Sequence, residues 1–155
     1  MDKYIEKRKY ERFDTEVKIH FYVPYDLKTK VNFEIKQTPP AASKKKYEGV
    51  SRNISAGGIC FSSSKKLEKG DGLILEVYLP QTQKPILMEG KVCWSQASRN
   101  NLPSVEQFDS GVQLTLVNGK SVEESIYFDH AHQVIWSAVL EMVLGSFSKL
   151  HKKVY

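Results

Sequence analysis

The sequence predicts a mainly β fold, a six-stranded antiparallel barrel followed by a long C-terminal α-helix. Apolar and polar residues alternate with a period of two in six short stretches before residue 118, which is typical of half-buried strands. Turn-forming residues separate these stretches and favour antiparallel neighbours in a closed all-β arrangement. After Asn118-Gly119 the apolar spacing becomes helical and continues to about residue 150.

The expected strands follow one another at short intervals. The first runs from Val17 to Val23, where Ile19 and Phe21 share the apolar parity. The other five are expected at Tyr47 to Ile54, Gly58 to Phe61, Leu73 to Leu79, Ile86 to Trp94 and Phe108 to Leu116. Residues 24–46, rich in Pro and Lys, are longer than most hairpin loops and are expected to form a mobile loop or an irregular extended hairpin. A second loop is expected over residues 95–107.

The helix expected over residues 121–150 begins with a capping box. Ser121 is the N-cap, and Glu124 stands three residues later. The apolar surface of this helix is wider than one stripe, which indicates contact with two neighbours, the barrel and a partner chain or second copy. The predicted organisation is a flexible arm over 1–13, the barrel over 14–119 and the helical segment over 120–155, packed on the barrel.

Composition excludes several classes of protein. The chain has 155 residues, is 41% hydrophobic and carries a formal net charge of +5, which fits one globular domain with an anionic partner or a lysine-coated surface. No apolar run reaches the ~20 residues that a membrane span needs, and no signal peptide is evident, so a cytoplasmic location is expected. Cys60 and Cys93 show no zinc spacing, His130 and His132 cannot share a metal at helical spacing, and no catalytic arrangement is supported. We therefore expect neither an enzyme nor a metal site.

Arginine is rare in this chain and unevenly placed. Of the 23 Lys and Arg residues, four are Arg. Three of the four lie in two short stretches, KRKYER at 7–12 and RNISAGG at 52–58. Because a guanidinium presents a planar fork of donors that matches a phosphate or a guanine edge two bonds at a time, this placement predicts a planar or doubly acidic ligand.

The two stretches contain a paired pattern. Arg8-x-x-x-Arg12 precedes the first expected strand, and Asn53-x-Ser55-x-x-Gly58 lies at the turn between two short strands. This pair, in this order and ahead of the later strands, resembles the PilZ domain family of cyclic di-GMP receptors. The resemblance runs from about Lys7 to Val117 and includes GDGLILEVYLP at 70–80, GKVCW at 90–94 and the Gly111-Val112 step. It implies a PilZ-like β-barrel in a bacterial, cytoplasmic signalling protein.

By this resemblance the ligand is cyclic di-GMP, and no cofactor is implied. The two arginines of the arm would hold guanine and phosphate edges, and the amide and hydroxyl of the turn would hydrogen-bond one guanine. The last glycine of the motif would let the backbone approach the ligand, because a Cβ there would intrude. The implied ligand-binding residues are Arg8, Arg12, Asn53, Ser55 and Gly58, with Lys7, Arg52 and Gly57 as secondary candidates. Arg52 shares parity with Val50 and Ile54, so it can face the core instead.

The predicted function is a non-enzymatic receptor that changes its arm and surface on binding cyclic di-GMP and signals to a protein partner in motility, biofilm or polysaccharide control. Ordering roughly five arm residues would cost about 5–10 kcal/mol, which a few charge-assisted bonds of about 1.5–3 kcal/mol each can offset. Two alternatives stay open, a PilZ-like adaptor that binds no nucleotide and a basic barrel that binds single-stranded nucleic acid. The paired motif argues against the first, and a shallow dependence of binding on salt would argue against the second. Self-association through the C-terminal helix is a further expected contact.

Overall fold

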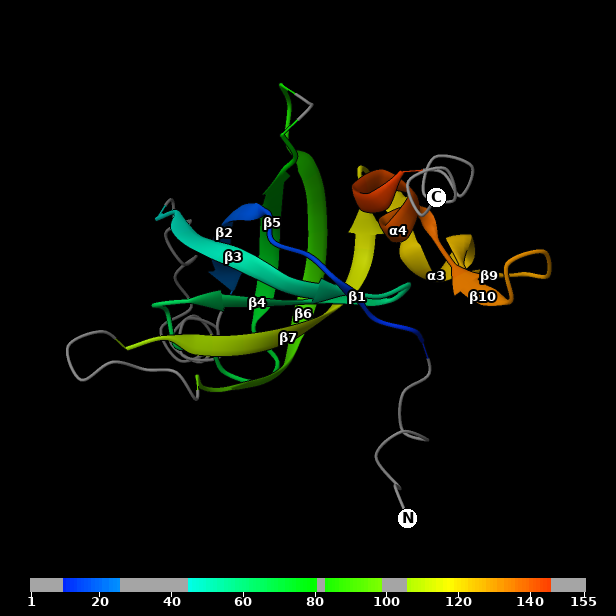
Figure 1. Ribbon diagram of the computed structural model, residues 1–155. Helices are drawn as coiled ribbons and strands as arrows, with labels where there is room; N and C mark the ends of the chain where they lie inside the picture. The colour runs from blue at the N-terminus through cyan, green and yellow to red at the C-terminus, as the bar shows by residue number, and fades with distance from the viewer. Residues whose placement is uncertain (1–9, 26–44, 81–82, 99–105, 146–155) are drawn as a thin grey trace, which may run out of the picture.

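The computed structural model describes residues 10–25, 45–80, 83–98 and 106–145. Six strands form the wall of a barrel: β2 (Lys18–Tyr25), β3 (Tyr47–Ile54), β4 (Gly58–Ser63), β5 (Gly72–Tyr78), β6 (Ile86–Ala97) and β7 (Phe108–Val117). They are antiparallel neighbours in the order β3-β2-β5-β6-β7-β4, and β4 pairs back with β3 to close the ring (Figure 1). The predicted six-stranded antiparallel barrel is therefore confirmed.

Alternation along the strands fills the barrel interior with apolar side chains. The rings of Phe21 and Phe61 are fully buried with centroids 4.9 Å apart, and Tyr47 stacks on Phe21 at 5.5 Å. Other fully buried barrel residues are Ile19, Leu75, Val77, Met88 and Val117. Because burying one such side chain stabilises the fold by about 1.5–3 kcal/mol, this interior forms a rigid frame for the turns at its ends.

A short first strand brings the N-terminal arm onto the barrel. In β1 (Phe13–Asp14), Asp14 lies opposite Asn53 and Phe13 lies opposite Ile54 of β3. The backbone N–H of Thr15 donates to the carbonyl of Arg52 at 3.1 Å and continues this edge toward β2. Residues 1–9 of the predicted arm, and the segments 26–44 and 99–105 that fall in the predicted loops, lie outside the described residues.

An irregularity in β3 decides which of its residues face solvent. The register between β3 and β4 shifts between Ser51 and Asn53. Ser51 and Ile54 are both buried as a result, while Arg52 is exposed and Val50 is 44% exposed. Val50 and Arg52 therefore share the exposed face, and the parity breaks only at Ile54, beyond the register shift. Arg52 does not enter the core.

The prediction of one long helix from residue 121 is wrong. The structure instead has two short helices, α3 (Val122–Ser125) and α4 (Ala138–Leu144), on either side of a hairpin formed by β9 (Tyr127–Asp129) and β10 (Val134–Trp136). The predicted cap is correct, because the Oγ of Ser121 accepts a hydrogen bond from the backbone N–H of Glu124 at 3.3 Å. β8 (Lys120–Ser121) pairs with β7 just before this cap. The predicted C-terminal part of the helix, residues 146–155, lies outside the described residues.

Local turn chemistry explains why the helix is interrupted. The Asp129 carboxylate accepts a hydrogen bond from the backbone N–H of His132 at 3.0 Å, which closes a turn, and Gln133 has a φ of 55°. In β10 the buried Val134 and Trp136 flank the partly buried Ile135, so the apolar residues also fit a period of two. Helical spacing and strand spacing are both satisfied here, and β-branched and aromatic side chains favour the strand.

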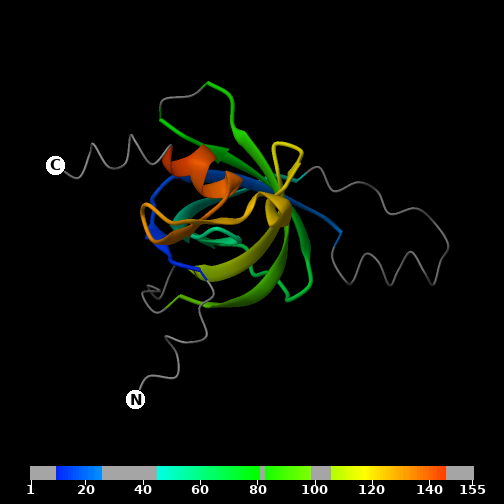
Figure 2. The ribbon, with the colours of Figure 1, turned by 90° about the vertical axis from the view of Figure 1, so that its right-hand side faces the viewer.

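The C-terminal elements pack beside the point where the arm enters the barrel. Trp136 is 1% exposed, its ring contacts Phe13 edge-on at 5.9 Å, and its Nε1 donates to Glu141 at 2.8 Å. Ser125 links the two helices, since its Oγ donates to the Val122 carbonyl and accepts from the N–H of Ala138. Figure 2 looks onto the end of the barrel that carries these elements.

Candidate functional site

The turn between β3 and β4 holds the polar residues of the second motif. The N–H of Ser55 donates to the carbonyl of Gly58 at 2.9 Å, and the N–H of Gly57 donates to the Oγ of Ser55 at 3.4 Å. The N–H of Leu114 donates to the carbonyl of Gly57 at 2.9 Å and ties the turn to β7. Asn53, opposite Cys60 at the end of β3, is thereby held on a fixed backbone.

The two glycines of this turn serve different neighbours. A Cβ on Gly58 would lie 2.7 Å from the carbonyl oxygen of Val112, so this glycine permits close pairing of β4 with β7. A Cβ on Gly57 would lie 2.8 Å from the ring of Tyr10, so this glycine permits the arm to lie against the turn. The expectation that Gly58 makes room for a ligand is therefore joined by a structural requirement of the barrel.

The arm places one motif arginine beside the turn. Arg12 is exposed, precedes β1 by one residue and lies two residues after Tyr10, whose ring covers Gly57. The positive charge of Arg12 also acts on Cys60 of β4, where it opposes the rise in the pKa of the thiol. Arg8 and Lys7 lie outside the described residues, so their placement stays a prediction.

A cavity of about 590 Å³ lies where the arm, the turn and the outer face of the barrel meet. It is lined by five of the predicted site residues: Arg12, Asn53, Ser55, Gly57 and Gly58. Arg52 is not among its lining residues. This volume is within the range of about 300–1,000 Å³ that is usual for small-molecule sites, and guanidinium, amide and hydroxyl groups converge on it.

The cavity also contains an aromatic side chain, Trp94, which is not among the predicted site residues. Trp94 lines the cavity and is 40% exposed. It lies opposite Gly111 across β6 and β7, and a Cβ on Gly111 would fall 2.2 Å from the indole Nε1. The indole therefore lies directly on the Gly111 backbone, at the level of Cys60 on β4. The GKVCW and Gly111-Val112 segments held this signal, but their pairing depends on a register that spans 17 residues of sequence, from Trp94 to Gly111.

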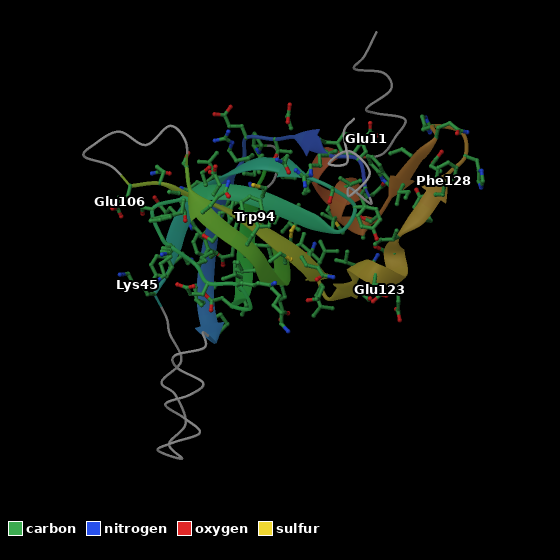
Figure 3. All side chains as sticks on the ribbon, turned by 90° about the horizontal axis from the view of Figure 1, so that it is seen from below. Glu11, Lys45, Trp94, Glu106, Glu123 and Phe128 are labelled. Carbon is green, nitrogen blue, oxygen red and sulfur yellow. The ribbon has the colours of Figure 1, made fainter. Side chains whose placement is uncertain are left out.

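The second wall of the cavity comes from the segment that was predicted to be one long helix. Ser121, Val122, Glu123 and Ile126 line it, and Gln113 and Thr115 of β7 face it from the barrel. Val122 is 1% exposed and anchors α3 on the barrel, while Glu123 is exposed. The barrel contributes Trp94 and the short helix contributes Glu123 (Figure 3).

Both cysteines also line the cavity, and both are free thiols. Cys60 lies on β4 and Cys93 on β6, with β7 between them. Strands lie ~4.8 Å apart, so the two backbones are separated by roughly 9–10 Å, beyond the ~7 Å reach of a disulfide. Burial raises the pKa of the Cys60 thiol and Asp109 adds to this effect, while the charges of Arg52 and Arg12 oppose it. Cys60 is therefore a neutral thiol at pH 7.

Within residues 10–25, 45–80, 83–98 and 106–145, no group of three or more His, Cys, Asp or Glu side chains could hold a metal ion. Over the same ranges, none of the helices has the length and apolar character that crossing a membrane requires. The residues that line the cavity offer hydrogen-bond donors, acceptors and an aromatic face, which suits binding of a planar polar ligand.

Two solved structures are similar to this chain. Among solved structures, the PilZ domain of YcgR from Escherichia coli, solved with c-di-GMP, matches with a TM-score of 0.50 at 10% identity, over 70% of this chain and 77% of that chain. The structure of the Bacillus subtilis inhibitor of motility, MotI/DgrA, matches with a TM-score of 0.46 at 20% identity, over 72% of this chain and 44% of that one. The present chain thus spans less than half of the MotI chain.

A comparison with curated proteins finds no match. The sequence model of the PilZ domain matches residues 6–128, a range that includes both motifs, the six barrel strands and α3. The YcgR domain independently has the same barrel fold. The chain therefore belongs to the PilZ domain family.

Proposed function

We propose that this chain is a receptor for cyclic di-GMP, the ligand with which the YcgR domain was solved. The carrying observation is the cavity, in which Arg12 from the arm, Asn53 and Ser55 from the turn and Trp94 from β6 line one space. Cyclic di-GMP is a compact anionic ring with two guanines and two phosphates, so it needs cationic, polar and aromatic contacts together. Membership of the PilZ family supports the same ligand.

Each group has a chemical role toward that ligand. The exposed guanidinium of Arg12 pairs with a phosphate or with the O6 and N7 of a guanine, a contact of about 1.5–3 kcal/mol. Arg8, four residues earlier in the sequence, would supply a second guanidinium. Asn53 and Ser55 hydrogen-bond a guanine edge from the turn.

Stacking on Trp94 adds a contact that does not depend on charge. The indole rests on the Gly111 backbone and is 40% exposed at the cavity. A base that stacks on an aromatic side chain contributes about 1–3 kcal/mol. Because the indole already packs on the Gly111 backbone in the free protein, binding costs little additional side-chain entropy at Trp94.

Binding is transmitted through the arm. Tyr10 and Phe13 contact the turn and the C-terminal elements, so the segment that carries Arg12 is held on the barrel and the proposed change falls on the residues before Tyr10. When the nucleotide engages Arg8 and Arg12, those residues dock and change the surface that a protein partner reads. Hydrogen exchange tests this step: equal protection of residues 1–9 with and without nucleotide would contradict it.

Titration calorimetry with cyclic di-GMP tests the ligand. We expect saturable binding by the intact chain and a loss of at least tenfold in affinity for Arg12→Ala, about 1.4 kcal/mol. Arg52→Ala is the matched control, because Arg52 is also an exposed arginine near Cys60 but does not line the cavity. Equal losses of affinity in both variants would show that the loss comes from the change in net charge and not from a contact between Arg12 and the nucleotide.

Two other outcomes separate the competing functions. Absence of binding heat with cyclic di-GMP would refute the receptor and favour an adaptor that binds no nucleotide. A steep decrease of affinity with salt, together with binding of single-stranded nucleic acid, would favour a polymer, because a polymer releases many counterions and a ligand with two phosphates releases few.

A further inference from the structure

Glu123 stands in the proposed nucleotide cavity with a charge opposite to that of the motif arginine. It belongs to α3, it is exposed, and it is the one carboxylate among the described residues that line the cavity. The motif residues at the turn supply an amide and a hydroxyl but no carboxylate. We propose that Glu123 reads the Watson–Crick edge of a guanine base and gives the site its preference for guanine over adenine, an assignment that rests on the proposed function.

The chemistry of the two purines explains why a carboxylate would discriminate. Guanine presents two adjacent donors on this edge, N1–H and the N2 amino group, and the two oxygens of a carboxylate can accept both. Adenine presents a lone pair at N1, which a carboxylate repels. The amide of Asn53 has one oxygen acceptor and one NH₂ donor, so it cannot accept from both guanine donors in parallel. A charged acceptor also makes stronger hydrogen bonds than a neutral one.

The local structure holds Glu123 at the cavity wall. The N-cap of Ser121 orients the first turn of α3, and Val122 is buried on the barrel next to it. The Oγ of Ser125 donates to the Val122 carbonyl at 2.7 Å and accepts from Ala138 at 3.0 Å, which joins α3 to α4. Across the described ranges, no hydrogen bond or ion pair engages the Glu123 carboxylate.

The charges in the cavity also suit the orientation of the ligand. Arg12 comes from the arm and Glu123 from α3, so a cation and an anion from two different segments line the same space. A phosphate is attracted to the guanidinium and repelled by the carboxylate. The ligand is therefore oriented with a phosphate toward the arm and a base edge toward α3.

The neighbouring Glu124 provides a matched control. It is also exposed and also lies in the first turn of α3, but it does not line the cavity. Any general effect of acidic residues on this helix end or on the net charge is shared by both positions. A contact with the ligand belongs to Glu123 alone.

The test compares the intact chain with its Glu123→Gln and Glu124→Gln variants by calorimetry, using cyclic di-GMP and cyclic di-AMP. We expect Glu123→Gln to weaken cyclic di-GMP binding at least tenfold and to narrow the ratio of the two affinities, because an amide donor replaces one acceptor. Glu124→Gln should leave both affinities within twofold of the parent. Thermal unfolding should show all three proteins equally folded.

The outcomes separate the two proposals. Parent-like affinity and selectivity in Glu123→Gln would overturn the role of Glu123 and leave the receptor function intact. Equal losses in Glu123→Gln and Glu124→Gln would also overturn it, because the effect would then be one of charge. Failure of the unmodified chain to bind cyclic di-GMP would overturn the receptor function and this inference with it.

Discussion

Replacing Gly57 by Ala tests whether the turn holds the arm in place. The new Cβ would lie 2.8 Å from the nearest ring carbon of Tyr10, whereas ordinary contacts begin at 3.4 Å. The ring must then move by about 0.6 Å (3.4 − 2.8) or leave the turn. Gly57 is not at a positive φ, so the backbone itself accepts Ala at this position.

The displacement should weaken nucleotide binding more than it weakens the fold. Arg12 is two residues from Tyr10, and hydrogen bonds lose strength quickly when their geometry is disturbed. Loss of one charge-assisted bond, about 1.5–3 kcal/mol, corresponds to a decrease in affinity of about 10- to 150-fold. The unfolding free energy should change by less than about 1 kcal/mol, because the side chain that must move is partly exposed.

Calorimetry with cyclic di-GMP and thermal unfolding measure the two quantities separately. In a Tyr10→Ala background the ring is gone, so the added Gly57→Ala change should cost no further affinity. Gly58→Ala is the contrasting variant, since its Cβ would lie 2.7 Å from the backbone oxygen of Val112 and should destabilise the barrel by about 1–3 kcal/mol. Unchanged affinity in Gly57→Ala would refute the positioning of Arg12 by this contact.

Three further outcomes are expected. Trp94→Ala should weaken cyclic di-GMP binding by about 1–3 kcal/mol, and the nucleotide should quench fluorescence in the parent but not in this variant; persistent quenching would contradict stacking. Trp136→Phe removes the hydrogen bond to Glu141 and should lower the unfolding free energy by about 1–3 kcal/mol while affinity is kept; a parent-like melting curve would speak against this bond. Burial alone would raise the pKa of Glu76, but hydrogen bonds from Lys46 and from tyrosines on β2 and β5 outweigh it and hold the pKa below the ordinary 4.5. The resulting stability is present above pH 4.5 and is lost as pH falls through the folded-state pKa, so Glu76→Gln should flatten the acid side of a plot of unfolding free energy against pH, and an unchanged acid side would contradict it.

The barrel could be predicted from the chain because its signals are local. Alternation of apolar residues, such as Ile19 and Phe21, marks each strand, and turn residues such as those at 70–72 separate them. The paired motif is equally local, since Arg8-x-x-x-Arg12 and the residues from Asn53 to Gly58 are each read within a few positions. The local fold and the family were therefore accessible without any knowledge of long-range contacts.

The helix prediction failed where two periods coincide. Residues from Ile126 to Trp136 satisfy helical spacing and strand spacing together, and the interruption depends on the Asp129 turn and the positive φ of Gln133. The hairpin is further stabilised by burial of Trp136 against Phe13, which lies more than a hundred residues earlier in the chain. A contact of that separation leaves no periodic trace in the sequence.

The sequence by itself determines the strands of the barrel and the paired motif. Side-chain periodicity and turn conformation are short-range properties, so neighbouring positions of the chain are enough to predict them. The composition of the cavity is different in kind. Trp94, Gly111 and Glu123 meet Arg12 and Ser55 there because barrel closure, strand register and the placement of α3 bring separate segments together. These are non-local pairings, so the cavity could be seen only once the whole chain was folded.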